Sequence, residues 1–551
     1  MSEYGKVEII RNKHRLAADL TRNVPGIDEY AIKCTGISEL LEIKFQLPVA
    51  EIAGFWHASR DPGAKMRLDW NIDFVCGGQF NFPGLAMLDR NCRCLWGITL
   101  TNIHDDTHFS AKLDQEKECY HIAITIAISE KTEDFTLRID QRRLPQDAML
   151  NDWRKSLDLP IYEFPEAAWN GVFCSWYAKH GAVDAAWLEP TAECAANLGF
   201  KTLIVDDGWC YDEYCRVNPE TLANWYRTIG DYRVSKVKFP NFAEHVKRVQ
   251  DMGLKYLLWV APHLIGCDSE FYANNSDAVI EPLTEGYRRF DVKNTAAGNQ
   301  LAEKLVLLMQ EGNLDGLKID FIDIVKPDPA SPNSRATTAF AKKLSDAVRS
   351  VKSDALIEFR QGYANCAMLP YATQFRIGDA PFDALRNFAR IAEIRMAMGS
   401  NVPIHADPAF WSKNDPAECV ARHMIGMLGA VPMVSMDLLT LSPTEKSIIR
   451  RWMDFYYQHQ TLLNHGKWRV EMKHHNIAAL TVEDDKKKII LLNDSNYISE
   501  IADSPGKETY LANLSERSAM WKADRVEDVL GSSTASSSVP VGGCAIRQDK
   551  C

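Results

Sequence analysis

The sequence predicts an α/β protein built around a (β/α)8 TIM barrel, with an N-terminal β-sandwich and a small C-terminal antiparallel β domain. Three observations carry this prediction. Strand-like and helix-like segments alternate through the middle of the chain, long helical periodicity is scarce before residue 150, and short β segments dominate after residue 465. The predicted boundaries are residues 1–150, 165–440 and 441–551.

The middle region has the pattern of a parallel sheet whose strands are joined by helices. Several expected helices end at a glycine, the usual C-terminal cap, and a new apolar strand follows each of them. Eight repeats over roughly 280 residues match a (β/α)8 barrel in count and length, with a doubly wound open sheet as the alternative. The expected strands cover residues 172–177, 201–207, 255–261, 316–321, 355–360, 374–378, 402–406 and 431–436.

The flanking regions read as β structure. Residues 41–47, 94–100 and 121–128 are β-rich, and several such segments alternate apolar with polar side chains, as half-buried strands do. Residues 147–157 form a helical link to the barrel. A helix over residues 443–463 opens the last region, and three short β segments follow it.

Composition bounds the class of protein. The 551 residues carry a net charge of -11, which argues against a nucleic-acid partner. No apolar stretch reaches about 18 residues, and residues 1–13 lack the pattern of a secretory signal, so we expect no membrane span and a cytoplasmic location. The 14 cysteines show no zinc spacing; Cys210 and Cys215 lack a matching second pair. We expect no metal or cofactor, and a homo-oligomer is compatible with the sequence.

Carboxylates recur where the predicted barrel strands end. Active sites of TIM barrels lie at the carboxyl ends of their strands, and carboxylates crowded there repel one another unless they bind something. Two carboxylates can cleave a glycosidic bond, one as nucleophile and one as acid and then base. Geometry alone is compatible with the pair Asp320 and Asp379 but does not single it out. The strand-end acids are Asp206, Asp207, Asp320, Glu358, Asp379 and Asp407.

Several motifs resemble the retaining α-galactosidases of glycoside hydrolase family 36 and the related family 27, in clan D. They are Asp206-Asp207-Gly208-Trp209, Gly316-Leu-Lys318-Ile-Asp320-Phe321, and Gly378-Asp379-Ala-Pro-Phe-Asp383-Ala-Leu-Arg386. The resemblance covers roughly residues 169–463, and the family architecture of sandwich, barrel and small β domain matches the three regions.

The resemblance implies a role for each matching residue. Asp320 would attack the anomeric carbon, and Asp379 would protonate the leaving oxygen and then activate water. Asp206 and Asp207 would hold sugar hydroxyls, and Lys318 would hold a hydroxyl and favour ionised Asp320. The substrate would be an oligosaccharide or glycoside. The remaining candidate substrate-binding residues are Trp176, Trp209, Trp259, Arg360, Arg376 and Asp383.

The chain departs from the family on its fifth strand. The family carries a Cys and a Gly-rich turn before an Arg there, whereas this chain has Glu358-Phe-Arg360-Gln361-Gly362-Tyr363, and Gly378 replaces the usual Ser before the acid/base. In the family, that loop normally recognises the sugar. Arg360 could therefore contact a carboxylate-bearing or otherwise modified sugar, or form an ion pair with Glu358 or a nearby Asp.

The sequence is also compatible with other functional hypotheses. A metal-dependent barrel hydrolase or isomerase could draw ligands from His263, Asp320, Asp323, His405 and Asp407. A non-catalytic sugar-binding relative is a third class. Within the glycosidase reading, the same two carboxylates serve hydrolysis and transglycosylation.

Overall fold

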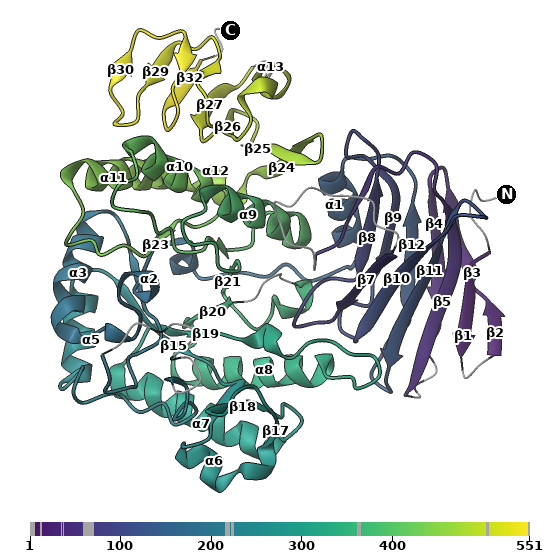
Figure 1. Ribbon diagram of the computed structural model, residues 1–551, viewed down its shortest axis with the longest axis horizontal. Helices are drawn as coiled ribbons and strands as arrows, with labels where there is room; N and C mark the ends of the chain where they lie inside the picture. Colours follow the sequence, from purple (N-terminus) through teal and green to yellow (C-terminus); the bar gives the residue numbers. More distant parts are fainter. Residues whose placement is uncertain are drawn as a thin grey trace.

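The computed structural model describes residues 6–11, 14–34, 36, 38–58, 71–214, 217, 221, 225–360, 365–502 and 506–548. It has an N-terminal pair of sheets, a central barrel and a C-terminal sheet that lies above the barrel helices (Figure 1). The α/β fold with a TIM barrel is confirmed.

The N-terminal sheets face each other across an apolar core. In the long central strand β5 (Glu39–Pro48) the side chains alternate: Leu41 and Ile43 are buried in this core, and Glu42 between them is partly exposed. This period of two is what the sequence displays and what a two-layer sandwich requires. One six-stranded sheet contains β1 (Glu8–Arg11), β2 (His14–Ala17), β5, β7 (Asn71–Cys76), β10 (Thr107–Asp114) and β11 (Cys119–Ile128). The other contains β3 (Asp19–Val24), β4 (Ile27–Ile32), β6 (Gly54–Trp56), β8 (Gly84–Leu88), β9 (Cys94–Leu100) and β12 (Phe135–Asp140).

Eight parallel strands form the barrel, in the order β22-β21-β20-β19-β15-β14-β13-β23. A parallel bridge between His405 and Val431 joins the first and last of them, so the sheet closes on itself. The strands are β13 (Val172–Cys174), β14 (Thr202–Val205), β15 (Lys255–Val260), β19 (Gly316–Ile319), β20 (Leu356–Arg360), β21 (Gln374–Arg376), β22 (Ile404–His405) and β23 (Met433–Val434). The main outer helices are α3 (Ala185–Asn197), α5 (Phe242–Asp251), α7 (Thr295–Gly312), α8 (Ser334–Val351), α9 (Ala384–Met398) and α10 (Ala417–Met427).

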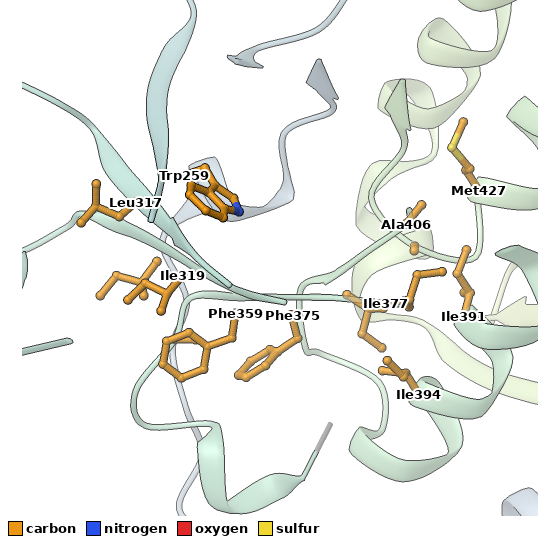
Figure 2. Packing of buried hydrophobic residues seen from close by; sticks show 14 of the residues in the cluster. Trp259, Leu317, Ile319, Phe359, Phe375, Ile377, Ile391, Ile394, Ala406 and Met427 are labelled. Atoms are coloured by element: carbon orange, nitrogen blue, oxygen red, sulfur yellow. The ribbon is translucent and has the colours of Figure 1, made fainter. Parts of the chain in front are cut away.

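Side chains inside the barrel change from apolar to charged along the strands. Near the strand starts, Val172, Ile204, Leu257 and Met433 form a small apolar cluster. The outward-facing side chains, among them Ile319, Phe359 and Phe375, pack in the large core shared with helix α9 (Figure 2). Neighbouring residues of a strand point to opposite faces of the sheet, so the residues next to these outward-facing ones, such as Lys318 and Glu358, point into the barrel.

Three details differ from the expectations. The first strand ends at Cys174 rather than residue 177, and Trp176 begins the short helix α2 (Trp176–Lys179). An extension absent from the expected element list follows the third strand. It consists of β16 (Leu264–Gly266), α6 (Glu270–Asn274), β17 (Val279–Pro282) and β18 (Tyr287–Phe290), and it projects from one side of the barrel (Figure 1).

The third difference concerns the C-terminal region. Its expected opening helix breaks at His459 into α11 (Pro443–Gln458) and α12 (Gln460–His465). The seven-stranded sheet is antiparallel except at one pair, where β26 (Lys487–Leu492) runs parallel to β27 (Glu508–Asn513). The short helix α13 (Ile498–Ile501) lies in the connection between these strands and gives the chain room to cross over. Among the described residues, no helix combines the length and apolar character that crossing a bilayer requires.

The N-terminal sheets hold two loops of the barrel. The Asp106 carboxylate accepts hydrogen bonds from the backbone N–H groups of Asp328, Asn333 and Ser334 at 2.8, 3.1 and 2.8 Å, at the start of helix α8. Asn365, after the fifth strand, donates from its side-chain amide to Asn81 O at 2.8 Å. The loops after the fourth and fifth strands are thus anchored by residues more than 200 positions away.

Candidate active site

The strand register gathers the predicted site residues at one end of the barrel. Lys318 of β19 is in register with Glu358 of β20, and Arg360 is in register with Arg376 of β21. Asp320 directly follows β19, so it shares the inward face with Lys318. The residues predicted at the ends of these strands therefore lie together at one end of the barrel.

Asp320 is buried and held by groups on several sides. The indole Nε1 of Trp259 donates to its Oδ2 at 2.9 Å, and the Phe321 N–H donates to its Oδ1 at 2.7 Å. Lys318 Nζ lies 3.8 Å from Oδ2 and Arg360 Nη1 lies 3.4 Å from Oδ1. Phe321 has a φ of 59°, a left-handed conformation that is uncommon for a bulky residue and occurs often at functional sites. The Asp320 side chain is thereby fixed in direction and kept close to two positive charges.

Asp379 is the more accessible of the two proposed catalytic carboxylates. Its side chain is 45% exposed, against 9% for Asp320. Arg360 Nη2 lies 2.9 Å from one of its oxygens and Arg376 Nη2 lies 2.9 Å from the other. Burial alone would raise the pKa of Asp379, but the charges of Arg360 and Arg376 outweigh it and hold that pKa well below the usual range. One guanidinium, that of Arg360, therefore joins Asp320 to Asp379.

The paired acids after β14 differ from each other. Asp206 accepts from the Cys174 thiol at 3.2 Å and forms an ion pair with Lys318. Asp207 accepts from the indole Nε1 of Trp225 at 2.7 Å, while its Oδ1 is buried and has no hydrogen-bond partner among the described residues. Burial raises the pKa of Asp207 to about 7 despite the Trp225 hydrogen bond, and the adjacent Asp206 charge adds to the rise. Asp207 can thus carry a proton near neutral pH.

Asp407 anchors the segment that carries Asp379. It forms an ion pair with Arg376, and its Oδ2 accepts from the Tyr177 hydroxyl at 3.0 Å and from the Ala380 N–H at 2.7 Å. Since Ala380 follows Asp379 directly, these contacts fix the chain on both sides of that carboxylate. Neither Tyr177 nor Trp225 was among the predicted site residues; no local pattern separated them from other buried aromatics.

Of four further residues predicted to bind the sugar, one contacts a proposed catalytic carboxylate and three have other partners. Trp259 touches Asp320 directly, whereas Trp209 is fully buried and donates its Nε1 to the Trp259 backbone carbonyl at 2.8 Å. Trp176 is partly exposed and stacks on His180 with ring centroids 4.5 Å apart. Asp383 caps helix α9 by accepting from the Arg386 N–H at 2.9 Å. Contact with a sugar stays a prediction for all four.

The residues of the metal-site alternative are bound to other protein groups or lie apart. His405 pairs through Nδ1 with Glu358 at 2.9 Å, and its Nε2 lies 2.8 Å from the Ala168 carbonyl. His263 is fully buried and packs edge-on against Phe340. Within the described part of the chain, the one cluster with metal-ligand spacing is Asp114, Cys119 and His121 on the N-terminal sandwich, away from the barrel mouth. Gln361, Gly362 and Tyr363 of the departing loop, and Cys215, lie outside the described residues.

In sequence, the chain is similar to proteins named α-galactosidases. Residues 164–342 match the family model described as Melibiase. The chain is α-galactosidase-like in sequence and fold. Over 344 residues it is 26% identical to α-galactosidase 2 of Pediococcus pentosaceus, covering 58% of this chain and 46% of that protein. Over 323 residues it is 23% identical to α-galactosidase AgaA of Geobacillus stearothermophilus, covering 53% of this chain and 41% of that protein. Each match thus spans less than half of the relative.

Solved structures of α-galactosidases share the fold. A variant of the family 36 α-galactosidase AgaA of Geobacillus stearothermophilus, solved with raffinose, aligns with a TM-score of 0.61 at 13% identity, covering 86% of this chain and 78% of that one. The α-galactosidase of Thermus thermophilus, solved with p-nitrophenyl α-D-galactopyranoside, aligns with a TM-score of 0.57 at 16% identity, covering 81% of this chain and 94% of that one. The resemblance to α-galactosidases predicted from the sequence is confirmed.

Proposed function

We propose that this chain is an exo-acting, retaining α-glycosidase of the α-galactosidase type. One observation carries the proposal. Asp320 and Asp379, which come from different strand ends of the barrel, contact the two ends of a single guanidinium at 3.4 and 2.9 Å. Two carboxylates held this close at a barrel mouth can act on the same glycosidic bond.

In the proposed reaction Asp320 is the nucleophile. Its carboxylate attacks the anomeric carbon and forms a covalent glycosyl-aspartate, while Asp379 protonates the leaving oxygen. Asp379 then removes a proton from water, and the water displaces Asp320 from the anomeric carbon. Retention of configuration follows from the two displacements.

The neighbouring residues receive supporting roles. Trp259 and Phe321 N–H orient the Asp320 carboxylate, and Lys318, 3.8 Å away, favours its ionised form. Asp206 and Asp207 bind hydroxyl groups of the sugar. For Asp207 this fits its unpartnered Oδ1, which lies buried beside the site and has capacity for a hydrogen bond.

The substrate class comes from the relatives. Because similar proteins are named α-galactosidases, and one was solved with raffinose, we propose a glycoside or oligosaccharide with a terminal α-galactose-type sugar. A transglycosylase would use the same two carboxylates and differ only in its acceptor. The twelve described cysteines are free thiols, which fits the cytoplasmic location that we propose.

The decisive experiment is a panel of aryl α-glycosides that share one aglycone. It contains galactose, N-acetylgalactosamine, glucose, xylose, arabinose and uronic acids, with NMR of the first-formed sugar. Turnover of an α-galactose-type member, with the α-anomer appearing first, supports the proposal. A first-formed β-anomer contradicts the retaining mechanism, and an absence of turnover across the panel supports a non-catalytic relative. Loss of activity on chelation, restored by a divalent ion, would instead favour the metal-dependent class.

The nucleophile is tested separately with Asp320→Gly. Turnover should be abolished, and azide should restore part of it by entering the vacated space and giving a glycosyl azide of inverted configuration. The matched comparison is Asp323→Gly, three residues along the chain, which should not show azide rescue. Unchanged activity in Asp320→Gly would remove Asp320 from the mechanism.

A further inference from the structure

Arg360 occupies an unusual place among the charges of the barrel mouth. It is the last residue of β20, and its guanidinium contacts both proposed catalytic carboxylates. Its Nε is buried and has no hydrogen-bond acceptor among the described residues. The side chain therefore has unused donor capacity at the point where the proposed reaction takes place.

Two other cations among the described residues of the mouth are each paired with a buried carboxylate. Lys318 is paired with Asp206 and its side chain is 2% exposed. Arg376 is paired with Asp407 and its side chain is 3% exposed. Arg360, at 17%, is the most accessible of the three, and its contact with Asp320 at 3.4 Å is looser than a good charge-assisted hydrogen bond. A ligand that enters the mouth therefore meets the guanidinium of Arg360 before the other two cations.

The contact between Arg360 and Asp379 conflicts with acid catalysis. To protonate a leaving oxygen, Asp379 must first carry a proton. Its two oxygens are instead occupied by Arg360 and Arg376, and both charges lower the pKa of this carboxyl. Arg376 cannot leave, because Asp407 holds it. Release of Asp379 therefore depends on a change at Arg360.

An anionic group on the substrate would make that change. A guanidinium presents a planar fork of donors that matches a carboxylate or a sulfate, and a charged pair of this kind is stronger than a bond to a neutral hydroxyl. Nη1 and Nη2, the atoms that contact Asp320 and Asp379, form such a fork. The substrate anion would then compete with Asp379 for the same guanidinium.

We propose that Arg360 recognises an anionic substituent, a carboxylate or a sulfate, on the α-galactose-type sugar, and that this contact draws the guanidinium from Asp379 and frees that carboxyl to take up a proton. The inference rests on the proposed glycosidase function and adds the substrate class to it. Arg360 is then a specificity-determining residue that couples recognition of the sugar to the readiness of the acid.

The test compares three substrates with one aglycone: 4-nitrophenyl α-galactopyranoside, the matching α-galacturonide, and the 6-O-sulfated α-galactoside. For the intact chain we expect at least one anionic substrate to exceed the neutral one in kcat/KM by about 30-fold, the size of a charge-assisted hydrogen bond. The uronide and sulfate arms distinguish the two sources of negative charge.

Two variants assign the preference to Arg360. Arg360→Gln should lower the anionic-to-neutral ratio of kcat/KM by about 30-fold, and Arg360→Lys should restore only part of it, because a lysine keeps the charge but loses the fork. Arg450→Gln is the control: it removes the same charge from an exposed position on α11 and should leave the ratio unchanged. A ratio near one in the intact chain, or a ratio that Arg360→Gln does not alter, overturns the proposal while leaving the glycosidase function standing.

A binding measurement covers the case in which turnover fails. In the Asp320→Ala variant, titration calorimetry should show galacturonate or galactose 6-sulfate binding at least about 10-fold more tightly than galactose, and adding Arg360→Gln should remove the difference. Equal binding of the anionic and neutral sugars overturns the recognition of an anion. Absence of turnover on all three substrates, with the anion preference in binding intact, counts against the glycosidase function alone.

Discussion

Trp259 donates a hydrogen bond from its indole Nε1 to Oδ2 of Asp320 at 2.9 Å, in a site where both side chains are almost fully buried. The two residues come from adjacent parallel strands, since Trp259 of β15 is in register with Lys318 of β19. The contact fixes the orientation of the proposed nucleophile without adding charge to the site.

Trp259→Phe should lower kcat/KM by about 10-fold, because it removes this hydrogen bond and keeps most of the ring. The matched control is Trp411→Phe, which removes another indole hydrogen bond to a carboxylate, that of Glu445 at 2.8 Å in the capping box of α11. Steady-state kinetics on one aryl substrate measures both. Equal effects of the two substitutions would count against a role for Trp259 in orienting Asp320.

Asp379→Ala should affect substrates according to their leaving groups. With an aglycone that needs protonation, such as a sugar, kcat/KM should fall about 10³-fold, and with 2,4-dinitrophenolate the first step should be nearly unaffected. Asp383→Ala is the comparison, since Asp383 caps α9 four residues away. Its effect should be the same for every leaving group. A loss in Asp379→Ala that is independent of the aglycone would argue against the acid role.

Asp207 should make stability depend on pH. Its pKa rises from 3.8 to about 7 in the folded protein, so the folded state holds a proton that the unfolded chain has lost. The stability that this proton contributes is present at low pH and is lost as the pH rises from about 4 to 7. Between pH 5 and pH 8 the Tm of the intact chain should therefore fall by about 2 °C or more relative to Asp207→Asn. Asp346→Asn, at an exposed site, should run parallel to the intact chain.

Asp106→Ala should destabilise the chain by about 3 kcal/mol. The substitution leaves the N–H groups of Asp328, Asn333 and Ser334 without their acceptor, and two of these bonds measure 2.8 Å. Asp73→Ala removes an exposed ion pair with His108 and should change stability by less than about 0.5 kcal/mol. Urea unfolding followed by fluorescence compares them. Equal stability of the two variants would contradict the importance of this anchor.

The residues at the barrel mouth could be predicted from the sequence, because which side chains of a strand face inward depends only on the spacing of neighbouring residues. Lys318 and Asp320 are two residues apart, so any strand through them must place both on one side. The same rule applies to Glu358 and Arg360, which are also two residues apart. Glycines after several of the helices marked where the next strand begins, and all eight expected strands are present in the barrel.

Contacts between distant residues could not be read in this way. Trp209 and Trp225 are both tryptophans near paired aspartates, yet Trp209 points to the Trp259 carbonyl and Trp225 to Asp207. The partner of each indole depends on tertiary contacts across 50 and 18 residues, which periodicity does not describe. The bridge that Arg360 makes between Asp320 and Asp379 likewise depends on where the sixth strand ends, three residues before Asp379. The extension formed by β16–β18 and α6 lacked the regular strand–helix spacing on which the prediction relied.

The side-chain amide of Asn365 donates to backbone carbonyls of the N-terminal region, at Gly77, Asn81 and Ile103. Those carbonyls belong to loops outside the barrel, yet they help fix the segment that follows the strand of Arg360. Trimming the chain to a minimal barrel, or grafting the barrel onto another carrier, would therefore remove part of the scaffold of its own mouth. In evolution as in protein engineering, we therefore expect the sandwich and the barrel to be kept together.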